Sequence, residues 1–203
     1  MGIERARLVV LISGTGTTLQ ALLDAASDND YPAEIVAVGT DRADAPGLVR
    51  ATTAGVDTFV VAPEGLTRPQ WDQALSEAIA SYKPDLVVCA GFMRLLGEHV
   101  LNQTGDKIIN THPALLPSFP GAHAVRDALA YGVKVTGCTI HIVDAGVDSG
   151  PVLAQESVVV YEDDDEESLH SRIKVVEQRL LPEVVSSLSR NDFVVSGRKV
   201  TIQ

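Results

Sequence analysis

Residues 8–18 read LVVLISGTGTT, an aliphatic run that passes through a glycine-rich turn. Consecutive aliphatic positions such as Leu8–Ile12 are typical of a strand that is buried on both faces. The turn opens the helical pattern Thr18–Ala26. A strand followed by a helix is the repeating unit of a parallel sheet, so this stretch predicts an α/β fold.

The same alternation continues to residue 110, with five strand-like runs in all. Each further run is short and aliphatic, and helical patterns lie between them, which predicts right-handed crossovers between parallel strands. We expect the other strands at Ile35–Val38, Thr58–Val61, Leu86–Ala90 and Ile108–Asn110, and the other helices at Gly47–Ala54, Pro69–Tyr82 and Gly97–Leu101.

The pattern changes after Asn110. A proline-rich stretch, residues 111–121, precedes a short predicted helix, Ala124–Tyr131. Two β segments, Val135–Val143 and Val152–Val160, could pair as a hairpin beside the sheet, and a last helix, Ser168–Ser189, should be interrupted at Pro182. We expect one domain, residues 1–203: an open, mostly parallel, Rossmann-like N-terminal half with a β segment pair and a C-terminal helix added.

The composition restricts the function classes. The net charge of −11 argues against nucleic-acid or anionic-membrane partners. No apolar run is long enough to span a membrane, and the N-terminus lacks a signal-peptide cleavage site, so a cytoplasmic location is expected. Cys89 and Cys138 lack zinc-site spacing, so we expect no metal and two buried free thiols. The acidic run, residues 162–167, is expected to form a solvated loop that leads into a helix.

Three segments fall where open parallel sheets bind ligands, at the carboxyl ends of the strands. The turn that contains Gly16 could bind a phosphate through backbone N–H groups at a helix N-terminus, or be a plain turn with a threonine cap. Asn110 and His112 should point to the same side of a strand, offering an amide donor and a proton carrier. The alternative for His112 is a local hydrogen bond in a His-Pro turn.

The third segment is the glycine-rich stretch Asp144–Gly150. Two carboxylates among glycines often form only a solvated turn. Near His112, however, Asp148 would orient the imidazole and stabilise its protonated form. His141, on an apolar strand, is more typical of a core residue with satisfied hydrogen bonds.

Four stretches in register resemble the phosphoribosylglycinamide formyltransferase family. They are residues 13–16 (SGTG), 90–96 (AGFMRLL), 110–117 (NTHPALLP) and 137–151, and together they extend over almost the whole chain. The resemblance implies transfer of a formyl group from 10-formyltetrahydrofolate, used as a cosubstrate, to the amine of phosphoribosylglycinamide, a step of purine synthesis. It implies small-molecule substrates and is compatible with a homodimer.

The resemblance also implies roles for individual residues. Asn110, His112 and Asp148 are the expected catalytic residues, with Thr139 and His141 in support. The ribonucleotide is expected to bind at Gly16, Thr17, Thr18 and Glu177, with Lys174 added here as a positive neighbour of the phosphate. The folate is expected to bind at Arg68, Met93, Arg94, Leu95, Leu96, Asn110, Asp144 and Val147.

The chain departs from the family pattern where Thr15 and Thr18 replace the usual Asn, and where Ser118 replaces a basic residue. Two relatives with the same chemistry are alternatives. A methionyl-tRNA formyltransferase would need an RNA-binding module and a basic face, and a formyltetrahydrofolate deformylase normally has an additional N-terminal regulatory domain. A non-catalytic nucleotide-binding domain would leave Asn110 and Asp148 unexplained.

Overall fold

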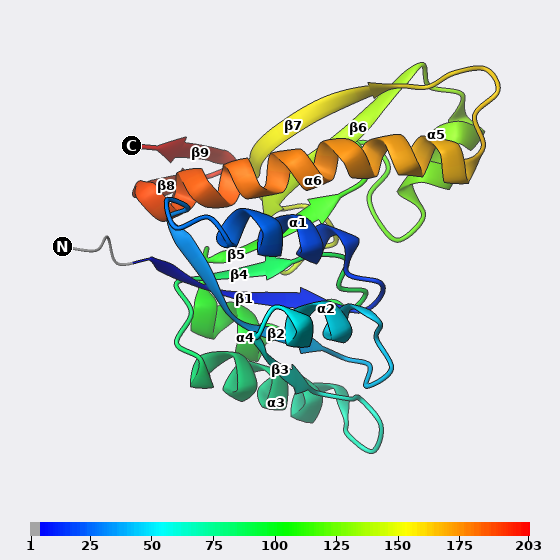
Figure 1. Ribbon diagram of the computed structural model, residues 1–203. Helices are drawn as coiled ribbons and strands as arrows, with labels where there is room; N and C mark the ends of the chain where they lie inside the picture. Colours follow the sequence, from blue (N-terminus) through cyan, green and yellow to red (C-terminus); the bar gives the residue numbers. More distant parts are fainter. Residues whose placement is uncertain (1–4) are drawn as a thin grey trace. The chain divides into compact units, whose positions relative to one another are not determined.

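The computed structural model describes residues 5–203, which divide into two compact units, unit 1 up to residue 109 and unit 2 from residue 110 to residue 203. In unit 1, β-strands and α-helices alternate (Figure 1). The elements are β1 (Ala6–Ile12), α1 (Thr17–Ala26), β2 (Ala33–Thr40), α2 (Gly47–Thr53), β3 (Asp57–Val60), α3 (Arg68–Ser81), β4 (Leu86–Cys89) and α4 (Glu98–Thr104). The next strand, β5 (Ile108–His112), runs from unit 1 into unit 2.

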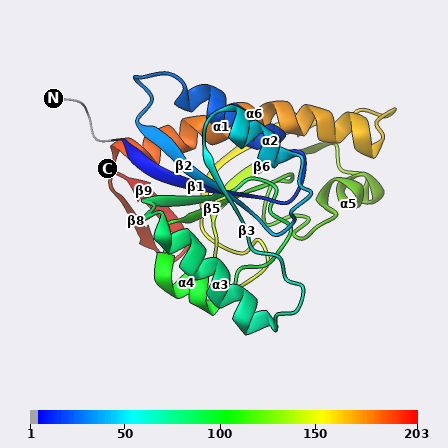
Figure 2. The same ribbon diagram turned by 60° about the horizontal axis from the view of Figure 1, so that its bottom comes forward.

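The strands of unit 1 form a parallel sheet in the order β3-β2-β1-β4. β1 lies at its centre, and Leu8–Ile12 are fully buried. Figure 2 shows α1 and α2 on one face of these strands and α3 and α4 on the other. Burial on both faces explains the unbroken aliphatic run. The predicted α/β class with a mostly parallel N-terminal half is confirmed.

Unit 2 contains a two-stranded antiparallel ribbon with helices packed against it. Its elements are α5 (Ala124–Tyr131), β6 (Val135–Ile142), β7 (Val152–Val159), α6 (Glu166–Arg190), β8 (Phe193–Ser196) and β9 (Lys199–Ile202). β6 pairs with β7, as expected, with a register irregularity between Ile140 and His141. The core joins α5, the ribbon and α6 through Val125, Cys138, Val158, Leu169 and Ile173.

Two helix predictions need correction. The expected interruption at Pro182 is wrong, because α6 continues through it to Arg190. Leu180 and Leu181 on one side and Val184 and Val185 on the other are buried, and this packing offsets the hydrogen bond that a proline cannot make. The second helix, α4, begins and ends later than expected, at Glu98 and Thr104.

The other local predictions can be checked residue by residue. Cys89 and Cys138 are buried free thiols, as expected. The acidic run leads into a helix, also as expected, and Asp165 caps α6 by accepting a hydrogen bond from the Ser168 N–H at 2.8 Å. The hairpin of β8 and β9 was not expected. Among the described residues, no helix is long and apolar enough to cross a membrane.

Candidate active site

The end of β5 presents the first candidate residues. The strand alternates its side chains, so Asn110 and His112 share a side and Thr111 lies on the other. His112 is buried and Asn110 half-buried. The Thr111 hydroxyl donates a hydrogen bond to the carboxylate of Glu177 on α6, which is also buried. Glu177 is thus hydrogen-bonded to Thr111, the residue between Asn110 and His112.

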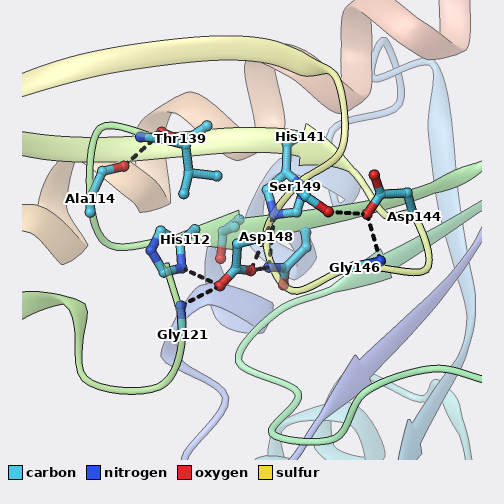
Figure 3. Close-up of polar contacts among 12 residues, drawn as sticks. His112, Ala114, Gly121, Thr139, His141, Asp144, Gly146, Asp148 and Ser149 are labelled. Atoms are coloured by element: carbon cyan, nitrogen blue, oxygen red, sulfur yellow. Dashed lines mark hydrogen bonds and ion pairs between the residues drawn. The ribbon is translucent and has the colours of Figure 1, made fainter. Parts of the chain in front are cut away.

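The loop between β6 and β7 brings Asp148 to these residues (Figure 3). Asp144 shapes the loop, because one of its carboxylate oxygens accepts from the Gly146 N–H at 3.0 Å and the Ser149 hydroxyl at 2.7 Å. Gly150 has no room for a side chain, since a Cβ there would lie 1.7 Å from the Ile142 carbonyl oxygen. Asp148 adopts a left-handed backbone with φ of 50°, which Asp tolerates better than most residues.

The Asp148 carboxylate is the centre of the cluster. Its Oδ2 accepts from the Gly121 N–H at 2.7 Å and lies 3.3 Å from His112 Nδ1. Its Oδ1 lies 3.5 Å from both His141 Nε2 and Asn110 Nδ2. The structure therefore brings together three predicted catalytic residues and His141, all within unit 2.

Hydrogen bonds to carbonyl groups fix the two histidine rings. His112 Nε2 lies 2.8 Å from the Phe119 carbonyl oxygen, and His141 Nδ1 lies 2.9 Å from that of Ile142. A carbonyl oxygen only accepts, so both ring nitrogens must carry a hydrogen. In the neutral ring His141 Nε2 accepts from the Asn110 amide at 3.2 Å, and in the charged ring it donates to Asp148 Oδ1 at 3.5 Å. The Asn110 carbonyl group is accordingly the end of this side chain that faces away from His141.

The pKa values of His112 and Asp148 are both lowered. Burial lowers the pKa of His112 below its ordinary 6.5, and the charge of Asp148 and the hydrogen bond to Phe119 oppose this shift. Burial alone would raise the pKa of Asp148. Hydrogen bonds from His141 and Gly121 and the charges of both histidines outweigh burial and leave that pKa below 3.8. Asp148 is therefore a carboxylate at neutral pH.

Thr139 holds the proline-rich segment that follows His112. Its hydroxyl donates to the Ala114 carbonyl at 2.6 Å (Figure 3). The same hydroxyl accepts from the Leu116 N–H at 3.0 Å. Gln155 on β7 donates to the same hydroxyl at 2.9 Å and to the Leu116 carbonyl at 2.8 Å. Thr139 thus holds the backbone of the segment that follows His112.

In unit 1, the glycine-rich turn has the geometry expected of a close backbone approach. Gly16 has φ of 68°, and a Cβ there would lie 2.9 Å from the Gly47 Cα. α1 begins at Thr17 and has no side-chain cap, so the expected alternative of a threonine cap is not what the turn contains. Thr18 is buried. Arg50, which sequence reasoning missed, donates to the Thr15 carbonyl at 2.8 Å.

The folate-side candidates of unit 1 also lie together. Met93 and Leu95 are large hydrophobic side chains that remain 71% and 59% exposed. Arg68 donates to the Leu95 carbonyl, and the guanidinium groups of Arg68 and Arg94 lie 5.0 and 5.8 Å from the centre of the Trp71 ring. Exposed apolar side chains beside two cations suit a ligand with a flat ring and carboxylates.

The remaining candidates lie in unit 2. Val147 is half-exposed on the loop that contains Asp144 and Asp148. Lys174 lies on α6, three residues before Glu177, and is half-buried. Sequence reasoning missed the backbone of Phe119 and Gly121, which contact His112 and Asp148. Backbone groups leave no signal in side-chain patterns. In residues 5–203, no group of three or more His, Cys, Asp or Glu side chains could hold a metal ion.

Comparisons with known proteins point to one family. The family described as formyl transferase matches residues 6–185. A phosphoribosylglycinamide formyltransferase of Mycobacterium tuberculosis is 54% identical over 198 residues, which is 97% of this chain and 91% of the relative. The Escherichia coli protein of that name is 39% identical over 180 residues, 88% and 85% of the two chains.

A solved structure shows the same likeness in three dimensions. The crystal structure of glycinamide ribonucleotide transformylase 1 from Symbiobacterium toebii has a TM-score of 0.95 and 46% identity. The match covers 98% of this chain and 94% of that one. The resemblance drawn from the four sequence stretches is confirmed.

Proposed function

This chain belongs to the formyl transferase family and is a formyltransferase, and from that premise we propose that it formylates the amine of phosphoribosylglycinamide in purine biosynthesis. Formyl transferases imply a folate-type formyl donor, and 10-formyltetrahydrofolate is the donor we propose. The observation that supports the proposal best is the Asp148 carboxylate, which lies 3.3 Å from His112 and 3.5 Å from Asn110.

The proposed reaction is a direct attack. The amine nitrogen bonds to the formyl carbon, and the carbonyl π electrons move to the formyl oxygen. The tetrahedral intermediate then collapses, the bond from carbon to N10 breaks, and N10 takes a proton. Over the whole reaction the attacking amine loses one proton and N10 gains one, so no other reactant is needed.

Asn110 and protonated His112 are the proposed stabilisers of the oxyanion. The Asn110 amide nitrogen carries two hydrogens and lies 3.5 Å from Asp148 Oδ1, so the hydrogen bond that one of them makes to this oxygen is weak. That hydrogen can be redirected to substrate at low cost. A preorganised donor to an oxyanion typically contributes about 3 kcal/mol.

Asp148 is the proposed acceptor of the amine proton, through a water molecule, and the group that favours the charged form of His112. Its lowered pKa keeps it ionised when the amine attacks. Thr139 and His141 support the site: Thr139 holds the backbone of Ala114 and Leu116, and His141 accepts from the Asn110 amide.

The two substrates are assigned to the residues that match the family. For the ribonucleotide we propose that Gly16, Thr17 and Thr18 donate hydrogen bonds to the phosphate. Lys174 and Glu177 are proposed as further contacts. The positive φ of Gly16 and the uncapped start of α1 support this. For the folate we propose Arg68, Met93, Arg94, Leu95, Leu96, Asn110, Asp144 and Val147.

The proposal extends to the setting of the enzyme. We propose that residues 1–203 act as one formyltransferase domain, in the cytoplasm, on small molecules rather than nucleic acid, and that two copies can form a homodimer. The net charge of −11 supports the absence of a nucleic-acid partner.

One assay tests the function against its alternatives. The enzyme is given 10-formyltetrahydrofolate with and without phosphoribosylglycinamide, and both formylated product and free formate are measured. We expect formyl transfer that requires the ribonucleotide, with little formate. Formate release at the same rate without the ribonucleotide would instead identify a deformylase. If the folate is not turned over in either mixture, the result would favour a non-catalytic nucleotide-binding domain.

A further inference from the structure

A buried carboxylate outside the proposed catalytic cluster lies at the carboxyl edge of the sheet in unit 1. Asp41 directly follows β2, and its side chain is only 4% exposed. Its Oδ2 lies 2.6 Å from Arg94 Nε, and its Oδ1 accepts from the Ser13 hydroxyl at 2.6 Å. A buried carboxylate is costly unless it is paired and hydrogen-bonded, and Asp41 is both.

The Ser13 hydroxyl extends this network to the backbone. It accepts from the Met93 N–H at 2.9 Å, and the Ser13 N–H donates to the Gly91 carbonyl at 3.1 Å. Ser13 follows β1, and residues 91–94 follow β4, so three neighbouring strand ends are joined. The segment that contains the folate-side candidates Met93 and Arg94 is therefore held by Asp41, directly and through Ser13.

The ion pair fixes Arg94 in a particular way. Asp41 binds Nε, and the guanidinium group also lies over the Trp71 ring. The guanidinium is planar and rigid, so a partner at Nε and a ring against its face set the direction of its terminal nitrogens. A preorganised Arg loses less entropy when it binds a carboxylate.

We propose that Asp41 is a positioning residue for the formyl donor: it orients Arg94 and the Met93–Leu95 backbone for folate binding and has no part in the chemical step. The proposal rests on the proposed function, which assigns Arg94 to the folate. Loss of the Asp41 side chain should therefore weaken folate binding, which is the opposite of what the loss of its negative charge alone would do. Removing a carboxylate beside Arg94 would strengthen anion binding if charge alone mattered.

The test is steady-state kinetics of Asp41→Ala. We expect the KM for 10-formyltetrahydrofolate to rise about tenfold, the loss of affinity that corresponds to one charge-assisted hydrogen bond. The kcat and the KM for the ribonucleotide should stay within about twofold. Asp41→Asn keeps an oxygen that can accept from Arg94 Nε, but it replaces the acceptor of the Ser13 hydroxyl by an NH2 group, so it should restore only part of the lost affinity.

Asp44→Ala is the matched control. Asp44 lies three residues further along, is 75% exposed and pairs with Arg42 at 3.0 Å, so its removal changes the net charge equally without touching the network. It should leave both KM values unchanged. Ser13→Ala is the second variant, which should raise the KM for the folate even if Asp41→Ala does not fold.

Trp71 provides a readout that does not depend on activity. It is the chain's single tryptophan and lies against Arg94, so its emission should shift in Asp41→Ala and not in Asp44→Ala. A shifted emission with an unchanged or lowered KM for the folate would overturn the proposal. If the wild-type enzyme neither turns over 10-formyltetrahydrofolate nor binds tetrahydrofolate in calorimetry, the proposed function itself fails, which is a distinct result.

Discussion

His112 Nδ1 lies 3.3 Å from Asp148 Oδ2, and the other nitrogen of the same ring lies 2.8 Å from the Phe119 carbonyl oxygen. Both neighbours are acceptors. A neutral imidazole has one N–H and can bond only one of them, whereas the imidazolium bonds both. Burial nonetheless lowers the pKa of His112. The hydrogen-bond geometry of the site therefore favours a charged His112, whereas burial disfavours it.

The first prediction concerns the His112 pKa. In the wild type it should lie below 6.5, and in Asp148→Asn it should fall further, because the carboxylate charge that opposes burial is gone. The measurement is an NMR titration of the ring nitrogens. Asp127→Asn, which removes an exposed carboxylate paired with Arg126, is the control and should leave the titration unmoved. A rise of the His112 pKa in Asp148→Asn would refute the assigned contact.

The second prediction concerns stability in acid. Since the His112 pKa is lower in the folded than in the unfolded chain, the unfolded chain binds more protons below pH 6.5. The free energy of unfolding should therefore decrease as the pH falls below about 6.5. His112→Gln should flatten this decrease in urea titrations. Burial also lowers the pKa of His170, so part of the slope should persist. An identical slope in His112→Gln would contradict the burial argument.

The third prediction separates backbone strain from ligand binding at Gly16. Gly16→Ala and Gly55→Ala both place a side chain at a positive φ, 68° and 72°, so each should lose about 1–2 kcal/mol of stability. Of the two, only Gly16 has atoms within 4 Å of the added Cβ, the nearest being the Gly47 Cα at 2.9 Å, so Gly16→Ala should lose more stability than Gly55→Ala. The KM for the ribonucleotide should rise in Gly16→Ala alone.

Denaturant unfolding and kinetics of both Gly16→Ala and Gly55→Ala check this prediction. If the folate KM rose in Gly16→Ala and the ribonucleotide KM held, the phosphate assignment would be wrong.

The fourth prediction concerns the support of the segment after His112. Thr139→Val keeps the shape of the side chain but removes the hydroxyl that donates to the Ala114 carbonyl and accepts from the Leu116 N–H. Leaving these buried groups unsatisfied should cost about 1–3 kcal/mol of stability. Because the segment leads from His112 to Phe119, kcat should fall as well. Thr139→Ser keeps the hydroxyl and should restore kcat; equal loss in both variants would count against the hydrogen bonds.

The sequence predicts those parts of the molecule that local patterns determine. The burial of Leu8–Ile12 can be predicted because it follows from an unbroken aliphatic run. The shared direction of the Asn110 and His112 side chains can be predicted because it follows from their spacing along a strand. The start of α4 depends instead on a distant residue. The Asp72 carboxylate on α3 accepts from the Gly97 and His99 N–H groups at 2.6 and 2.8 Å, which no local pattern signals.

The same contrast holds within the site. A resemblance to known enzymes singles out Asp148, but the contact with the Gly121 N–H depends on how the segment 113–121 folds back. Phe119 has a positive φ of 54°, which is uncommon for an aromatic residue and gives no sequence signal. Asp41 was missed because its role requires three strand ends to meet.

The most direct test of the central claim, that His112 and Asp148 act as one catalytic unit, is a double-mutant cycle on kcat. Asp148→Asn suits a left-handed backbone and should fold normally, yet kcat should fall by about 10²–10⁴, the range of a lost acid–base group. His112→Ala should cost a similar factor. Combined, the two changes should cost little more than the worse single change. Strictly multiplicative losses would mean that the two residues act independently and would contradict the account.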